Sequence, residues 1–76
     1  MLTEQQVRDA MKQGAGVKDP QAIGINELFS AFGLDSMDLF NLLVELEVLT
    51  GIKVPDESVG KLNTIKAILD YYNARG

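Results

Sequence analysis

The segment from Asp35 to Thr50 constrains the fold more than any other part of the sequence, because one predicted helix carries two apolar stripes. At about 100° per residue, one stripe consists of leucines only: Leu39, Leu42, Leu43, Leu46 and Leu49. The stripe on the opposite side consists of Met37, Phe40, Val44 and Val48. Asp35 is the expected N-cap, with Asp38 at the third helical position, and Gly51 is expected to end the helix. The leucine stripe predicts that this helix packs one side on a core.

A first helix is predicted from Thr3 to Gln13, because Thr3 and Gln6 form a capping-box pattern. Gly14 and Gly16 are expected to end this helix by adopting left-handed conformations. Residues 14–35 then form a long connection, in which a single helical turn is expected over residues 26–29, with an end at Gly33. Because a structureless loop of this length is unusual, its apolar residues predict that it packs across the core.

Two further helices are predicted after the central one. A short helix from Asp56 to Lys61 begins next to Pro55, which favours the first helical position. The last helix runs from Ile65 to about Ala74, with Asn63 or Thr64 as its cap and Arg75 and Gly76 at its close. Its apolar stripe consists of Ile65, Ile68, Leu69 and Tyr72. No segment has a convincing strand pattern. The sequence therefore predicts an all-α fold, a small four-helix bundle with three longer helices, one short third helix and a long first loop.

The sequence contains no His and no Cys, so the commonest general base and the commonest thiol nucleophile are both absent. Transition-metal sites usually need one of the two. We therefore expect no catalytic residue, no enzyme activity and no metal site, and a protein that acts by binding or by being modified. The lack of disulfides, of an apolar run long enough to span a membrane and of a signal peptide favours a cytoplasmic monomer, with residues 1–76 as one domain.

Acidic charge gathers around the central helix. Residues 27–57 contain seven acids and one lysine, a net charge of −6, whereas the whole chain has −4. One interpretation is a solvated acidic face; the other is a docking surface for basic partners, with the second apolar stripe partly exposed for contact. In the second case Met37, Phe40 and Val44 stay at least half exposed. Either way the field argues against nucleic-acid binding.

Ser36 stands at the start of the central helix, within Gly33-Leu34-Asp35-Ser36-Met37-Asp38. By itself this is a capping pattern, and without His the serine has no partner for a catalytic triad. A phosphodiester on the Ser36 oxygen would, however, lie at the positive end of the helix dipole. The loop before it would let a modifying enzyme reach the hydroxyl.

Together with the following segments, this motif resembles the acyl carrier protein family. The matching residues are Leu28-Phe29, Phe32 to Asp38, Leu42, Leu43, Leu46-Glu47, Gly51 to Glu57 and Thr64-Ile65. The resemblance covers about residues 26–74. The Asp-Ser-Met triplet is a weak motif alone, but with the helix after it and Val-Pro-Asp-Glu at this spacing it is specific.

The resemblance implies a carrier whose Ser36 receives 4'-phosphopantetheine from coenzyme A through a phosphopantetheinyl transferase. The terminal thiol of the arm then holds acyl cargo as a thioester, in fatty-acid, polyketide or related biosynthesis. The other implied partners are acyl-loading, synthase and transferase enzymes with basic docking patches. The residues implied in partner binding are Asp35, Met37, Asp38, Phe40, Val44 and Glu47. The family also shelters apolar cargo between its second and third helices, or presents it to enzymes.

Three positions depart from the fatty-acid pattern of the family. Asn41 and Val48 stand where an acid is usual, and Lys53 stands where an acid is common. These differences favour a specialised pathway over primary fatty-acid synthesis. Alternative functions are an aminoacyl or peptidyl carrier, or an unmodified helical adaptor that binds partners with Ser36 bare.

Overall fold

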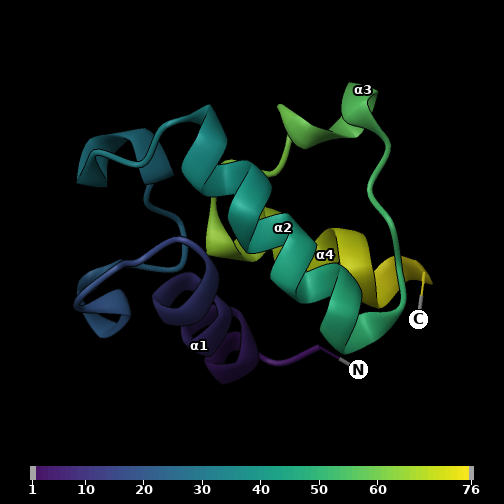
Figure 1. The fold of residues 1–76 in the computed structure, drawn as a ribbon, viewed down its shortest axis with the longest axis horizontal. Helices are drawn as coiled ribbons and strands as arrows, with labels where there is room; N and C mark the ends of the chain where they lie inside the picture. The colour runs from purple at the N-terminus through teal and green to yellow at the C-terminus, as the bar shows by residue number, and fades with distance from the viewer. Residues whose placement is uncertain (1, 76) are drawn as a thin grey trace.

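Four α-helices and two short 3-10 helices form the fold in the computed structural model, which describes residues 2–75 (Figure 1). The α-helices are α1 (Glu4–Gly14), α2 (Ser36–Thr50), α3 (Asp56–Val59) and α4 (Ile65–Arg75). The 3-10 helices η1 (Pro20–Ala22) and η2 (Phe29–Phe32) lie in the connection between α1 and α2. Residues 2–75 contain no strand, so the all-α prediction is confirmed. The last residue expected to close α4, Gly76, lies outside the described residues.

The caps predicted at the starts of α1 and α4 and at the end of α2 are present. At α1, the Thr3 N–H donates to Gln6 Oε1 at 2.9 Å and the Gln6 N–H donates to Thr3 Oγ1 at 3.2 Å, which completes the capping box. At α4, Thr64 Oγ1 accepts from the Ala67 N–H at 3.0 Å, so Thr64 is the cap of the two candidates. Gly51 ends α2 in a left-handed conformation, with φ of 74°.

The core lies where α1, α2 and α4 meet. Its most deeply buried side chains come from all three helices and from the first loop: Val7, Met11, Ile23, Leu42, Leu46, Ile65, Ile68 and Tyr72. In the leucine stripe of α2, Leu43 is also buried and Leu39 is half-buried. Leu49 was expected in the core but is 52 % exposed. It borders two open clefts beside Gln6, because α1 does not cover the last turn of α2.

Gly14 corrects the predicted end of α1. It is the last helical residue rather than a left-handed cap, and the left-handed conformation occurs at Gly16, with φ of 68°. A Cβ at Gly14 would lie 2.5 Å from Glu45 Cγ and 2.9 Å from the Asn41 carbonyl oxygen. Gly14 is therefore a point of close approach between α1 and α2, and its small size serves packing.

The first loop, residues 15–35, packs across the core as predicted, through buried Ile23 and Phe29. The expected helical turn over residues 26–29 is displaced: η2 occupies Phe29–Phe32, and Gly33 ends it with φ of 78°. The displacement places Phe29 in the core, where its N–H donates to the Asn63 carbonyl at 2.9 Å. Tertiary packing thus decides the position of a turn whose local signals are weak.

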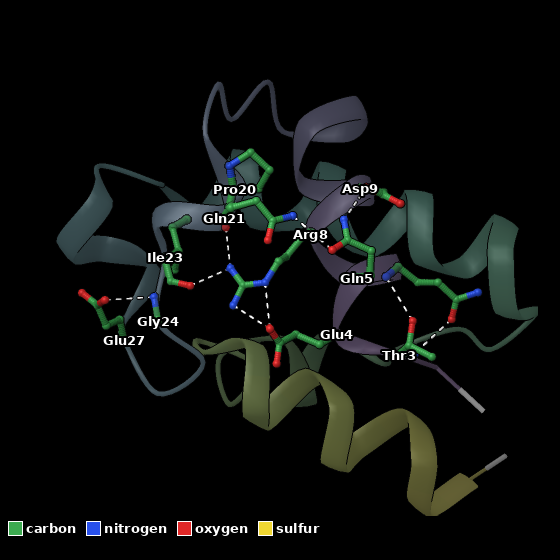
Figure 2. A network of polar contacts seen from close by, with 11 residues as sticks. Thr3, Glu4, Gln5, Arg8, Asp9, Pro20, Gln21, Ile23, Gly24 and Glu27 are labelled. Atoms are coloured by element: carbon green, nitrogen blue, oxygen red, sulfur yellow. Dashed lines mark hydrogen bonds and ion pairs between the residues drawn. The ribbon is translucent and has the colours of Figure 1, made fainter.

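A buried arginine holds the same loop in place (Figure 2). Arg8 Nη1 donates to the Ile23 carbonyl at 2.6 Å and also to the Pro20 carbonyl. On its other side, Arg8 Nε and Nη2 contact Glu4 Oε2 at 3.0 and 2.9 Å. One guanidinium therefore joins the first turn of α1 to the two ends of η1. It gives the Ile23 carbonyl a donor and adds a second donor to the Pro20 carbonyl, which also accepts from the Ile23 N–H.

α3 is shorter than predicted and ends at Val59 rather than Lys61. None of its residues is buried. Because short helices depend on packing for their stability, α3 extends over a single turn only. Val54 and Val59 are half-buried against α2, and the next fully buried residue is Leu62.

The two ends of the described chain are tied together. The Leu2 N–H donates to Asn73 Oδ1 at 2.9 Å, and Asn73 Nδ2 donates to the Leu2 carbonyl at 3.2 Å. Both residues line one hollow with Leu49 and Thr50, at the C-terminal end of α2. Within residues 2–75, each helix falls short of the length and apolarity that a membrane crossing requires.

Candidate functional site

Ser36 is the first residue of α2 and its side chain is exposed. The residues beside it form a capping box, in which the Asp38 N–H donates to Asp35 Oδ1 at 2.9 Å. In return the Asp35 N–H donates to Asp38 Oδ2 at 3.2 Å. Both acids lie at the positive end of the helix dipole, which their charges complement. The serine is thereby held at a fixed, open corner where the first loop becomes helix.

The first turn of α2 also offers hydrogen-bond donors to an anion. Because the first N–H groups of a helix have no acceptor within it, the N–H groups of Ser36 and Met37 point out of the helix end. The capping box uses the N–H groups of Asp35 and Asp38 instead. A phosphate linked to the Ser36 oxygen fits this corner, since the helix end favours negative charge.

The second apolar stripe of α2 runs away from Ser36 and is exposed. Met37 is 64 % exposed, Phe40 53 % and Val48 81 %. Val44 is 42 % exposed, slightly less than the half that was predicted, because it borders α3. Neither the first loop nor α3 covers this stripe, so the partly exposed interpretation is the right one.

A cleft of about 200 Å³ lies between α2 and α3. From α2 it is lined by Phe40, Leu43, Val44 and Glu47, and from the α3 side by Lys53, Val54, Asp56 and Val59. Its near end, Phe40, lies one helical turn from Ser36, because residues four apart share a helix face. Glu47 is half-buried at its far end. The opening is therefore apolar inside, with charged groups around it.

Comparison with known proteins shows the family of the chain. A family model described as "Phosphopantetheine attachment site" matches residues 5–72. The chain belongs to this family. The carrier also resembles a solved structure of 3-oxo-butyl-ACP, an intermediate mimic from the actinorhodin polyketide synthase in Streptomyces coelicolor. That match has a TM-score of 0.79 and 29 % sequence identity, over 96 % of this chain and 88 % of the other.

The match establishes the function in outline. The protein is an acyl carrier, and its cofactor is covalently attached 4'-phosphopantetheine. The four-helix carrier fold with a short third helix is confirmed in the same way. Both the fatty-acid and the polyketide assignment remain compatible with these comparisons.

All seven site residues named from the sequence of this carrier lie along α2, either in its first turn or beside the cleft. Asp35, Ser36, Met37 and Asp38 share the first turn of α2, and Phe40, Val44 and Glu47 border the cleft. Sequence reasoning expected apolar residues of the second, third and last helices to line a cargo cavity, but it did not name the two valines that form the far wall, Val54 and Val59. The apolar alternation of Ile52, Val54 and the later Val59 was the available signal, but it does not show which face of α2 they meet.

Sequence reasoning also placed Tyr72 in the core without considering its hydroxyl. The tyrosine is buried, and its hydroxyl has no hydrogen-bond partner among residues 2–75. Burial raises the pKa of Tyr72 to about 12, with smaller contributions from Tyr71 and from the charge of Glu47. The group is therefore a neutral hydrogen-bond donor at physiological pH.

Proposed function

We propose that Ser36 carries the 4'-phosphopantetheine arm and that residues 1–76 act as one carrier domain without catalytic activity of their own. The observation that carries the proposal is the position of Ser36, an exposed hydroxyl at the first residue of a capped helix. The other hydroxyls of residues 2–75 stand elsewhere in the fold: Thr3, Ser30, Thr50, Ser58, Thr64, Tyr71 and Tyr72.

The residues around Ser36 fit a phosphodiester. The N–H groups of Ser36 and Met37 would donate to its oxygens, and the helix dipole would favour its charge. Asp35 and Asp38 hold the helix end and mark the site for the transferase. When bound, the arm supplies a thiol that holds the acyl group as a thioester, which no residue of this Cys-free chain can supply.

The exposed stripe supports a docking role for the face next to Ser36. Met37, Phe40 and Val44 provide apolar contact area, and Asp35, Asp38 and Glu47 surround it with negative charge. Partners with a basic rim around an apolar hollow complement this surface. We assign it to the phosphopantetheinyl transferase and to the loading, synthase and transferase enzymes that exchange cargo with the carrier.

The pathway we favour is a specialised one, of the polyketide type. Asn41 and Val48 make the exposed side of α2 less acidic than a primary fatty-acid role would suggest. The likeness to a carrier from a polyketide synthase is in agreement with this choice.

The test is the intact mass after incubation with coenzyme A, magnesium and a broad-specificity phosphopantetheinyl transferase. We expect the protein to gain one phosphopantetheine and Ser36→Ala to gain none. Ser30→Ala is the matched control, because Ser30 is also an exposed serine, in η2, and its loss should leave the gain unchanged. Modification of Ser36→Ala would show that another residue is the attachment site. If the unaltered protein gains no mass while a control carrier does, the adaptor hypothesis takes precedence.

A further inference from the structure

Two exposed apolar side chains of the first loop take no part in the site described above. Leu28, which precedes η2, is 49 % exposed, and Phe32, the last residue of η2, is 42 % exposed. These fractions are similar to those of Phe40 and Val44 in the exposed stripe of α2. Because exposed apolar side chains that lie close together commonly mark an interaction surface, η2 has the character of a second contact surface.

This surface adjoins the corner that bears Ser36. Gly33 follows Phe32 with φ of 78°, and Ser36 stands three residues further on. Phe32, Leu34 and Asp38 border a common hollow of about 390 Å³, so η2 lies beside the first turn of α2. Ser36 is therefore flanked along the chain by two apolar surfaces, η2 before it and the exposed stripe of α2 after it.

The hollow beside Phe32 is open to a side chain of a partner. Val17, Ile23 and Leu34 line it with apolar groups. Ile23 is buried, and Arg8 Nη1 donates to its carbonyl at 2.6 Å, so this wall is fixed before a partner arrives. Binding to a surface that is already ordered avoids the entropy cost of ordering a loop.

The charges of this region determine which kind of partner fits. The segment from Glu27 to Asp38 contains three acids and no base. The hollow is lined by Lys18 as well as by Asp19 and Asp38, which leaves one net negative charge at its edge. A second copy of the chain would bring like charges together, whereas a partner with basic residues around an apolar side chain is complementary.

We propose that η2 is a second docking surface for the phosphopantetheinyl transferase, with Phe32 as the residue that contributes most to binding. The inference rests on the proposed attachment at Ser36. An enzyme that acts on this hydroxyl has to cover the corner, and η2 adjoins the corner on the side that the stripe of α2 leaves free. Aromatic side chains near the centre of an interface commonly supply much of its binding energy.

The experiment measures transfer and binding separately, with a broad-specificity phosphopantetheinyl transferase as the probe. The carriers are the unaltered protein, Phe32→Ser, Leu28→Ser and Leu49→Ser. We expect kcat/KM for phosphopantetheine transfer to fall about tenfold in Phe32→Ser and about threefold in Leu28→Ser, because each loses apolar contact area. The loss should appear in KM with kcat unchanged, since neither substitution alters Ser36.

Leu49→Ser is the matched control. Leu49 is 52 % exposed but lies in the last turn of α2, far from Ser36, so its kcat/KM should equal that of the unaltered protein. Circular dichroism of each variant checks that it folds. If Phe32→Ser does not fold, Leu28→Ser decides in its place, because Leu28 lines neither the core nor the hollow.

Binding of the transferase to Ser36→Ala carriers separates this inference from the attachment at Ser36. The dissociation constant should rise about tenfold when Phe32→Ser is added to Ser36→Ala, and stay the same when Leu49→Ser is added. Equal constants for these two double variants, or a fall in kcat with KM unchanged, would overturn the inference. A failure of attachment at Ser36 would instead appear as the absence of a mass gain, and the binding measurement would still decide the role of Phe32.

Discussion

The two segments that flank α2 are held in different ways. The first loop buries Ile23 and Phe29, and Arg8 fixes two of its carbonyl groups from inside the protein. The segment from Gly51 to Thr64 buries only Leu62, and α3 rests on α2 through half-buried valines. The first loop, which precedes the N-terminus of α2, is therefore firmly packed. The segment that follows α2 and borders its cleft is weakly packed.

The difference matches two separate demands on a carrier. If Ser36 bears the arm, as we propose, its corner has to present the same shape to each enzyme that acts on it, and a fixed first loop provides this. The cleft between α2 and α3 would adapt more readily to what it contacts, because weak packing makes local opening easy. Within one small domain, stability is therefore unequal: it is concentrated on the side of the first loop and reduced near α3.

The sharpest test of this difference truncates one side chain in each segment. Ile23→Ala should lower the free energy of unfolding by about 2–5 kcal/mol, because it leaves a cavity in the core. Val59→Ala should lower it by about 1 kcal/mol or less, since Val59 is only half-buried and the space left by its methyl groups stays open to solvent at the cleft. Urea unfolding measures both values. Similar losses in the two variants would show that α3 is as firmly packed as the first loop.

A second prediction concerns the arginine that holds the first loop. Arg8→Met should lower the free energy of unfolding by about 2–3 kcal/mol, because the Pro20 and Ile23 carbonyls lose their buried donor. Arg75→Met is the matched control. Arg75 is exposed and lies 3.6 Å above the ring of Tyr71, a contact for which we expect a loss of about 1 kcal/mol or less. If Arg8→Met unfolds no more easily than Arg75→Met, the guanidinium does not fix the loop.

The smallest of the three effects is a loss of stability in alkali. The pKa of Tyr72 is about 12 in the folded protein and 10 when the residue is solvated, so above pH 10 the unfolded chain releases a proton that the folded chain retains. Tyr72 should therefore contribute a loss of about 1.4 kcal/mol at pH 11, which is present in the unaltered protein and absent in Tyr72→Phe. The measurement is urea unfolding of both proteins between pH 8 and 11.

The alkaline test also sharpens the comparison of the two segments. Ile52 of the weakly packed segment borders the same hollow as Tyr72. If this segment opens without global unfolding and exposes the Tyr72 hydroxyl, the hydroxyl ionises near pH 10 in the folded protein. Tyrosinate absorbance would then rise in the folded state, and the difference between the two proteins in unfolding would shrink. A late titration instead means that the weakly packed segment still shields Tyr72.

Helix positions were predictable from the sequence because their signals are local. The capping boxes at Thr3 and Asp35 and the stop at Gly51 each depend on residues within a few positions of one another. The prediction of Ser36 at the start of α2 needed nothing more. The exposed stripe from Met37 to Val48 was predictable in spacing, but only the packing of the loop and α3 decided that it remains uncovered.

Features that depend on contacts between distant segments escaped the prediction. The sequence around Gly14 predicts a helix stop. In the structure, however, the position has no room for a side chain, because Asn41 and Glu45 of α2 approach it closely. The local pattern around Arg8 is that of an ordinary charged residue on an amphipathic helix. Its buried role was not predictable, because its carbonyl partners lie twelve and fifteen positions away in the sequence. The same reason applies to Leu49, whose exposure depends on where α1 begins and ends.

The hydrogen bonds between Leu2 and Asn73 have a practical consequence for displaying the protein. They hold the two chain ends at one pole, and Ser36 lies at the other end of α2, about 20 Å along the helix. A surface anchor or a flexible tether fused at either terminus would therefore leave the serine corner facing outward. In a tandem array joined in this way, linker length would set the local concentration of the Ser36 hydroxyls.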